Sequence, residues 1–354
     1  MKCETNVIIS SKGNRIIKYL MVNDVGMEVE VLNLGATLTK IMVPDQDGNF
    51  ENVVLEWQDI NVYEENPGYI GAIIGRMAGR IHKARITLDE KVYKLTKNEN
   101  DNILHGGAEG LHHKFWNGMV KCTDNEARLQ LCCKSKDGEE GFPGNVEVKV
   151  TYILNNDNQL SIQYEANTDQ LTVVNLTNHA YFNLSGNGKR SVLEQEVWID
   201  SNKIFELDNE SIPTGKMLSL DEEYSFDFRK AKAIGKDIAN DSVQLRYGKG
   251  YDHLWLLNQR NEKNIELYDP ISERCMDITT TEPCVVMYTM NNPPSEKLKI
   301  ANQEIRYGIC FETQKCAIGY DEVFKEPCLL TPHITYHSET RYKFSIRKKV
   351  NRLK

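Results

Sequence analysis

The sequence predicts an all-β protein built as a large sandwich. Three observations predict it: apolar and polar residues alternate in short runs, turn-forming pairs separate these runs, and sustained helical periodicity is scarce. Alternation of this kind gives each strand one buried face and one polar face. No repeat, low-complexity linker or break in composition marks a boundary, so residues 1–354 are expected to form a single domain.

The expected elements can be followed along the chain. Short strands begin at residues 27–32 and continue to residues 342–346, with turn signals such as Asp47-Gly48 between them. The clearest pair is a hairpin of residues 146–154 and 160–166, joined by an Asn-Asn-Asp-Asn turn. Residues 229–239 are the best helical candidate, but they contain Gly235 and are expected to add only a turn or two of helix.

Residues 176–184 place an imidazole and several polar groups in an otherwise strand-like run. Side chains alternate across a strand, so Thr177, His179, Tyr181 and Asn183 are expected on one face and apolar residues on the other. This pattern is typical of a strand that lines a polar cavity. A core histidine with satisfied hydrogen bonds beside a strand end explains the segment equally well.

The charge of the chain bears on its partners. A formal net charge of −8 argues against a nucleic-acid groove or an anionic membrane surface, because both bind concentrated positive charge. The first residues lack the apolar core of a signal peptide, and no stretch approaches the roughly 18 apolar residues of a membrane span. We expect a cytoplasmic protein, monomer or homodimer, with a small-molecule partner and a solvated basic tail from residue 347 onward.

The cysteines and histidines do not suggest a metal centre. Nine cysteines, an odd number, include adjacent Cys132 and Cys133 and no C-x-x-C spacing, so reduced and packed thiols are expected. His112 and His113 would point to opposite faces of a strand. The sequence also has no Rossmann fingerprint, Walker A loop or G-x-S-x-G elbow, so neither a metal nor a cofactor is expected.

Five polar residues lie in contexts rich in glycine, aromatic or apolar residues, where a charged or titratable side chain needs a partner or a ligand. They are Arg80, His105, His179, Asp252 and Glu312. Planar donors and carboxylates of this kind recognise neighbouring sugar hydroxyls, and an aromatic wall covers the C–H face of the ring. The residues considered for this wall are Trp116, Tyr181 and Trp255.

Structural explanations remain open for these residues taken singly. Arg80 would form an ion pair under a glycine-packed turn, and His105 and Asp252 would be turn residues beside glycines. Alternation would place Glu312 on a solvent-exposed strand face and His253 opposite Asp252, in a structural role. Close backbone packing is the expected reason for the glycine series Gly71, Gly75 and Gly79.

The ordered motifs together resemble those of the aldose 1-epimerases, or galactose mutarotases. They are Asn33-Leu34-Gly35-Ala36-Thr37, Val43-Pro44-Asp45, Gly75-Arg76-Met77-Ala78-Gly79-Arg80-Ile81, Leu104-His105-Gly106-Gly107, Thr177-Asn178-His179-Ala180-Tyr181-Phe182-Asn183-Leu184, Gly250-Tyr251-Asp252-His253, Thr281-Glu282-Pro283 and Phe311-Glu312-Thr313-Gln314. The resemblance implies a galactose mutarotase-type β-sandwich, or supersandwich. It also implies cofactor-free interconversion of the α and β anomers of a hexose such as galactose or glucose.

The resemblance also implies residue roles. His179 would be the general acid at the ring oxygen, and Glu312 the general base at the C1 hydroxyl. Arg80, His105 and Asp252 would bind the sugar hydroxyls. The chemistry would benefit from burial that raises the pKa of Glu312 and from a partner that keeps His179 protonated.

The chain departs from the family at several positions. Gly79 stands where asparagine is common and Val286 where glutamine is frequent, which bears on sugar preference or affinity. His112 and Gln195 also differ, and no consequence is assigned to them.

Three rival functions remain. A sugar-phosphate 1-epimerase would need converging positive charge for a phosphate dianion. A non-catalytic carbohydrate-binding protein would need no acid–base pair. A glycosidase would use Asp252 and Glu312 on either side of a glycosidic bond.

Overall fold

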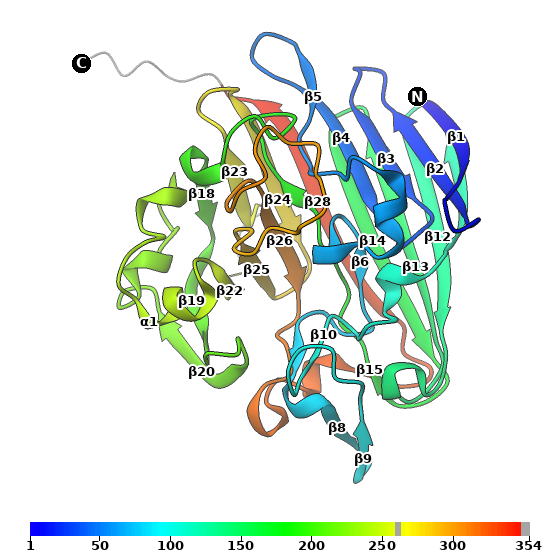
Figure 1. Ribbon diagram of the computed structural model, residues 1–354, viewed down its shortest axis with the longest axis vertical. Helices are drawn as coiled ribbons and strands as arrows, with labels where there is room; N and C mark the ends of the chain where they lie inside the picture. Colours follow the sequence, from blue (N-terminus) through cyan, green and yellow to red (C-terminus); the bar gives the residue numbers. More distant parts are fainter. Residues whose placement is uncertain (259–262, 348–354) are drawn as a thin grey trace.

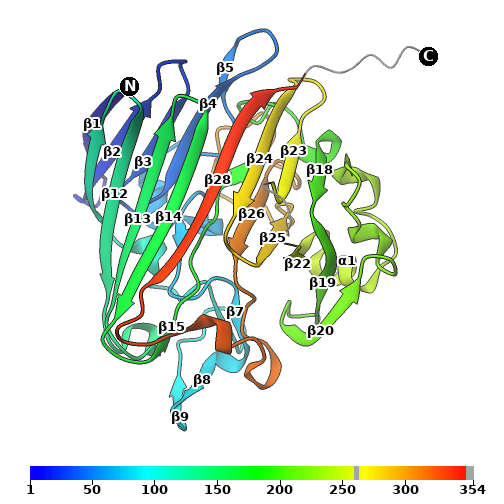
Figure 2. The same cartoon turned by 180° about the vertical axis from the view of Figure 1, so that it is seen from behind.

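Strands dominate the computed structural model of the chain, which describes residues 1–258 and 263–347 (Figures 1 and 2). The all-β class predicted from the sequence is confirmed. The tail expected beyond residue 347 lies outside the described residues. Among the described helices, none is long and apolar enough to cross a bilayer.

One layer of the sandwich is a nine-stranded sheet, nearest the viewer in Figure 2. In spatial order its strands are β11 (Asn117–Cys122), β12 (Glu126–Ser135), β13 (Val146–Asn155), β14 (Gln159–Thr168), β28 (Tyr336–Ile346), β24 (Arg274–Thr280), β23 (Ile265–Tyr268), β18 (Glu196–Ile199) and β21 (Lys232–Ala233).

Two sheets form the facing layer, in front in Figure 1. The five-stranded sheet contains β1 (Lys2–Ile9), β2 (Arg15–Val22), β3 (Glu28–Leu32), β4 (Leu38–Pro44) and β5 (Phe50–Asn52). The six-stranded sheet contains, in spatial order, β17 (Tyr181–Phe182), β26 (Ile309–Gln314), β25 (Cys284–Tyr288), β22 (Asp252–Leu257), β19 (Ser201–Leu207) and β20 (Pro213–Ser219).

Four short strand pairs and several short helices complete the described fold. The two-stranded pairs are β10 (Ile103–Leu104) with β7 (Arg80–Ile81), β15 (Thr172–Val173) with β27 (Leu329–Leu330), β16 (Thr177–Asn178) with β6 (Ile73–Ile74), and β8 (Arg85–Leu88) with β9 (Lys91–Lys94). The helices are α1 (Val243–Gly248) and the 3-10 turns η1 (Ile60–Glu64), η2 (Pro67–Tyr69), η3 (His82–Ala84), η4 (Leu111–His113), η5 (Glu139–Gly141), η6 (Val192–Glu194), η7 (Tyr224–Phe226), η8 (Ile234–Lys236), η9 (Tyr320–Glu322) and η10 (Glu326–Cys328).

The main core lies between the two layers. Trp255 and Phe311 of the six-stranded sheet and Ile162 and Ile278 of the nine-stranded sheet belong to one buried cluster. Each such apolar side chain, when fully buried, stabilises the folded protein by about 1.5–3 kcal/mol relative to leaving it exposed. The opposite face of the six-stranded sheet is therefore available for polar side chains.

The hairpin predicted at residues 146–166 is confirmed. β13 and β14 are antiparallel, with Leu154 opposite Leu160. In the turn, the Asn155 side chain accepts hydrogen bonds from the backbone N–H groups of Asp157 and Gln159, and Asn158 adopts a positive φ of 55°. These asparagine properties made the turn recognisable in the sequence.

The helix expected at residues 229–239 is wrong in part. The segment contains β21 and the 3-10 turn η8, whereas the α-helix of the described chain lies at Val243–Gly248. β21 pairs with the edge of β18, where Ala233 is opposite Glu196. This tertiary pairing outweighs the weak helical propensity of the segment.

Residues 176–184 do not form one continuous strand. β16 ends at Asn178 and β17 begins at Tyr181, and the two pair with different sheets. The Asn178 side chain accepts from the N–H of Ala180 and donates to the carbonyl of Gly71, which supports the break. His179 therefore lies at the point where the chain changes sheet.

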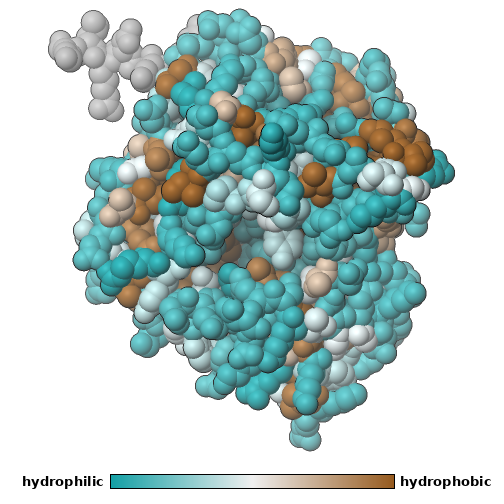
Figure 3. Space-filling view, in the orientation of Figure 1, coloured by the Kyte–Doolittle hydropathy of each residue, from teal (hydrophilic) through white to brown (hydrophobic). Residues whose placement is uncertain are grey.

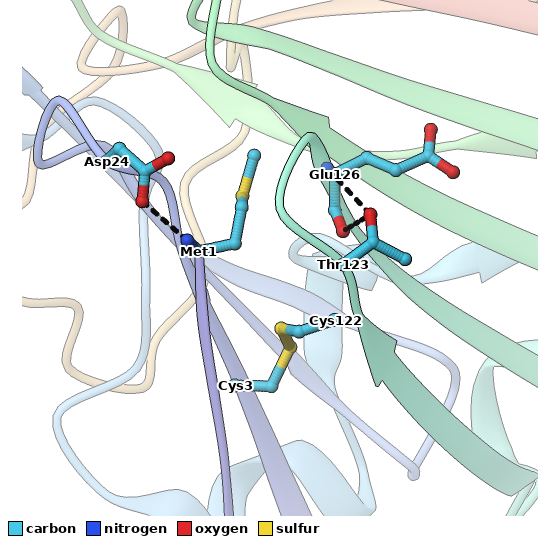
Figure 4. Close-up of a disulfide and its surroundings, with 6 residues drawn as sticks. All are labelled: Met1, Cys3, Asp24, Cys122, Thr123 and Glu126. Atoms are coloured by element: carbon cyan, nitrogen blue, oxygen red, sulfur yellow. Dashed lines mark hydrogen bonds and ion pairs between the residues drawn. A yellow bond between two sulfur atoms is a disulfide. The ribbon is translucent and has the colours of Figure 1, made fainter.

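The expectation of nine reduced thiols is also wrong. Cys3 of β1 and Cys122 of β11 form a disulfide with Cα atoms 6.2 Å apart (Figure 4). The other seven cysteines are free, and five of them are buried. The two cysteines are 119 positions apart in the sequence, and only the folded arrangement of the two sheet edges brings them together.

Candidate active site

A cavity of about 260 Å³ opens beside the six-stranded sheet, and Figure 3 shows a hollow near the middle of this face. Side chains of β22, β25 and β26 line it together with residues from the segments around β7 and β10. All five residues selected from the sequence line this cavity: Arg80, His105, His179, Asp252 and Glu312. The fold thus brings together side chains that are far apart in the chain.

The register of the six-stranded sheet positions Glu312. Leu254, Val286 and Glu312 lie opposite one another on β22, β25 and β26. Phe311 belongs to the core, whereas Glu312 and Gln314 line the cavity, as alternation along β26 requires. Glu312 is only 3% exposed, so the alternative of a carboxylate on a solvent-exposed face is wrong.

Backbone hydrogen bonds hold His179 in the break between β16 and β17. Its N–H donates to the carbonyl of Ala72, and its own carbonyl accepts from Gly71. Its Nε2 lies 3.5 Å from Oε1 of Glu312, and its Nδ1 lies 3.5 Å from Sγ of Cys310. The imidazole is therefore fixed beside the carboxyl group with Nε2 toward it.

His105 occupies a turn and lines the cavity at the same time. It has a φ of 54°, and Gly106 and Gly107 follow with positive φ, as the turn explanation required. Its Nδ1 accepts the N–H of Gly79 at 3.2 Å. In the neutral ring the proton is then on Nε2, which makes Nε2 a hydrogen-bond donor.

Arg80 forms the ion pair that its structural explanation required. Its Nε and Nη2 donate to the two carboxylate oxygens of Glu99 at 2.5 and 2.8 Å. Both residues line the cavity, so the pair is structural and also part of the site. Nη1 of Arg80 takes no part in this fork.

Burial changes the protonation of the acidic and basic groups. It raises the pKa of Glu312 to about 8, with the charge of Asp252 adding to the effect and Arg80 opposing it. It lowers the pKa of His179 to about 4 and raises the pKa of Asp252 to about 6. At pH 7 the ligand-free cavity therefore has a protonated Glu312 and a neutral His179. The raised pKa of Glu312 is the shift that the sequence interpretation favoured. For His179 that interpretation favoured a protonated ring, whereas its pKa is lowered.

The aromatic wall differs from the sequence interpretation. Tyr181 lines the cavity, as expected. Trp116 and Trp255 are buried, and their indole N–H groups donate to the carbonyls of Leu111 and Phe226. The prediction that these two tryptophans form the wall is therefore wrong. The aromatic side chains that line the cavity are those of Tyr69, Tyr181 and Tyr288.

The remaining histidines have other surroundings. His112 and His113 lie in the 3-10 turn η4 instead of a strand, and Nε2 of His113 contacts the carbonyl of Glu65. His253 is fully buried and contacts the side chain of Gln244, in agreement with its expected structural role.

One group of cavity residues has the composition of a metal site. Ligand atoms of His105, His179 and Glu312 lie within 4.8 Å of one another. The Gly79 N–H already uses Nδ1 of His105, which puts the ring proton on Nε2. This arrangement favours a hydrogen-bond donor at His105 over a metal ligand.

The two departures from the family pattern both line the cavity. A Cβ on Gly79 would lie 2.8 Å from Cβ of Ala317, so the chain packs too closely here to accept a side chain without a shift. Close packing is also found at Gly71, where a Cβ would lie 2.1 Å from the carbonyl oxygen of Leu38. Val286 is buried between Leu254 and Glu312 and makes that part of the floor aliphatic.

Sequence reasoning missed six polar or aromatic residues of the cavity: Tyr69, Glu99, Ser211, Tyr288, Asn292 and Gln314. Gln314 had a signal, because it belongs to the same short motif as Glu312. Glu99 had none, since it lies in the charged run Lys97-Asn98-Glu99-Asn100-Asp101, which reads as an ordinary solvated loop.

A buried carboxyl group and an imidazole 3.5 Å apart, in a polar cavity on a β-sandwich, define an enzyme that moves protons on a small polar molecule. The sequence model of the family described as Aldose 1-epimerase matches residues 18–343. The chain belongs to the aldose 1-epimerase family. It is an isomerase that interconverts the anomers of an aldose.

Individual relatives agree with this assignment. A galactose mutarotase of Rattus norvegicus is 34% identical over 343 residues, 96% of each chain. An aldose 1-epimerase of Escherichia coli (strain K12) is 32% identical, covering 91% of this chain and 93% of that protein. The crystal structure of a galactose 1-epimerase from Lactobacillus acidophilus NCFM has a TM-score of 0.88 at 28% identity, covering 98% of this chain and 100% of that one. The galactose mutarotase-like fold is thereby confirmed.

Proposed function

We propose that this enzyme interconverts the α and β anomers of a hexose such as galactose or glucose, with Glu312 as the general base and His179 as the general acid. The observation that carries the proposal is the buried pair itself, with Nε2 of His179 3.5 Å from Oε1 of Glu312. The names of the relatives support galactose as a substrate.

The reaction needs one proton removed and one proton added. Glu312 takes the proton of the C1 hydroxyl while His179 gives a proton to the ring oxygen, and the C1–O5 bond breaks. The aldehyde turns about its C1–C2 bond, and the ring closes from the other face with the two roles reversed. The pair carries one proton throughout. A sugar hydroxyl that donates to Glu312 favours its charged form and so moves this proton to His179 before ring opening.

Three residues would hold the sugar during this turn. The Asp252 carboxylate would accept hydrogen bonds from sugar hydroxyls. Nε2 of His105 and Nη1 of Arg80 would donate hydrogen bonds to sugar oxygens, the latter with a positive charge. Support comes from their positions around the same cavity. Arg80 is already paired with Glu99, and among the described lining residues it alone carries a permanent positive charge. This charge balance favours a neutral sugar over a sugar phosphate.

For the whole protein, we infer a single domain that works in the cytoplasm as a monomer or homodimer within carbohydrate metabolism. Continuity of one core cluster across the large sheets supports the single domain. Seven of the nine cysteines are free, which is the pattern of a reducing compartment, and the Cys3–Cys122 disulfide is the exception to it.

Polarimetry tests the proposed function. Freshly dissolved α-D-galactose and α-D-glucose should reach anomeric equilibrium faster with the wild type, and His179→Asn and Glu312→Gln should each lower kcat by about 10²–10⁴-fold. Circular dichroism would show whether each variant is folded. Folded variants with wild-type rates would refute the assigned roles, and activity on glycosides would favour a glycosidase.

A further inference from the structure

Gln314 carries an unused polar group at the cavity. It is fully buried, and its Oε1 finds no hydrogen-bond partner within residues 1–258 and 263–347. Its Nε2 donates to the carbonyl of Lys315, which fixes the amide orientation, because a flip would bring two oxygens together. A buried unpaired amide oxygen costs about 1–3 kcal/mol, so a ligand that pairs with it gains binding energy.

The position of Gln314 relative to the proposed acid and base identifies the part of the sugar beside it. Gln314 follows Glu312 by two residues, and Cys310 precedes Glu312 by two residues on the same strand face. His179 lies toward Cys310, with Nδ1 3.5 Å from Sγ. His179 and Gln314 are therefore associated with opposite sides of Glu312 along β26.

A pyranose ring has the matching order around its anomeric carbon. C1 carries the hydroxyl that the base deprotonates, and its two ring neighbours are O5 and C2. With Glu312 at the C1 hydroxyl and His179 at O5, C2 lies on the side of Gln314. Gly79, which also lines the cavity, adjoins this amide, because a Cβ on Gly79 would lie 3.5 Å from Nε2 of Gln314.

We propose that the Gln314 amide binds the hydroxyl group on C2 and makes the enzyme select 2-hydroxy aldoses over 2-deoxy aldoses. The inference rests on the proposed function of the Glu312–His179 pair. The amide offers one unpaired oxygen and a second N–H, so it can accept from or donate to this hydroxyl. A 2-deoxy sugar leaves the buried amide unpaired, and discrimination of about tenfold or more is expected.

The test is a cycle of two substrates and two proteins. The kcat/KM values for D-galactose and 2-deoxy-D-galactose are measured by polarimetry, with the uncatalysed rate subtracted, for the wild type and Gln314→Leu. We expect the wild type to favour D-galactose by about tenfold or more, and Gln314→Leu to lose this preference through a slower reaction of D-galactose alone. Gln163→Leu is the matched control, because Gln163 of β14 donates a hydrogen bond to Glu339 of β28 and does not line the cavity.

The possible results distinguish a failure of the Gln314 role from a failure of the proposed epimerase function. Equal wild-type rates for both sugars, or a preference that survives in Gln314→Leu, would overturn the role of Gln314 and leave the epimerase assignment intact. Absence of acceleration with either sugar in the wild type would overturn the proposed substrate, and the role of Gln314 with it. The wild-type comparison needs no variant, and Gln314→Met replaces Gln314→Leu if the latter does not fold.

Discussion

Glu312 and His179 share one proton at neutral pH, and this proton controls the proposed chemistry. The two groups are buried, with Nε2 of His179 3.5 Å from Oε1 of Glu312, so a proton can pass between them. Loss of the shared proton removes the acid, and gain of a second proton removes the base. One proton on the pair is what ring opening needs, and sugar binding places that proton on His179.

The pH profile follows from this proton count. The second proton binds near the pKa of His179, about 4, and the shared proton leaves near the pKa of Glu312, about 8. Asp252, whose pKa is about 6, gains its charge between these limits and should improve sugar binding. We expect kcat/KM to rise from pH 4, to be highest between pH 6 and 8, and to fall above pH 8. Polarimetric rates across this range check it, and a flat profile from pH 7 to 10 would contradict it.

Sequence reasoning reached residues whose motifs combine a polar group with glycine or apolar neighbours. His105, His179 and Glu312 all belong to such motifs and line the cavity. Glu99 could not be found this way, because its pairing with Arg80 is created by the fold. The ionisation of His179 was missed for a similar reason, since burial decides it and is a property of the whole site.

At the scale of the element, β26 joins the core to the chemistry. Phe311 is 1% exposed and packs in the main cluster, while its neighbour Glu312 lines the cavity. The position of the carboxyl group therefore depends on how firmly the core holds the strand.

Phe311→Ala tests this dependence. We expect the free energy of unfolding in urea to fall by about 3–5 kcal/mol, because the substitution leaves a cavity in the core. Phe50→Ala is the matched control, since Phe50 is 41% exposed and should change the value by no more than about 0.5 kcal/mol. Equal losses in the two variants would show that Phe311 does not anchor β26.

Elements defined by local patterns were predicted best. The β13–β14 hairpin has both regular alternation and a turn rich in asparagine. The break at His179 and the strand β21 were not predicted, because they depend on partners such as Ala72 and β18 that are remote in the sequence. Short strands of this type have no periodicity of their own to detect.

At the scale of the whole molecule, the sequence predicted the sandwich but not how its edges are joined. Frequent turns and scarce helical periodicity were sufficient for the fold class. The contact between β1 and β11 requires the two layers to be assembled first. The Cys3–Cys122 disulfide could therefore not be inferred from cysteine spacing.

Reduction of this disulfide should lower stability. A crosslink between residues 119 positions apart restricts the unfolded chain and is worth about 4–5 kcal/mol in the loop-entropy description. We expect dithiothreitol to lower the Tm of the wild type by several degrees, toward that of Cys3→Ser. The Cys3→Ser protein is the control, because its Tm should not respond to the reductant. A wild-type Tm that is unchanged by reduction would contradict the prediction.

The same crosslink has a consequence for self-association. β1 and β11 are terminal strands of their sheets, and each carries exposed apolar side chains, Val7 and Ile9 on β1 and Met119 on β11. Unpaired strand edges of this kind are templates on which further chains can add and aggregate. By fastening the two edges to each other, Cys3 and Cys122 restrain the N-terminal strand from peeling away and recruiting a neighbouring molecule.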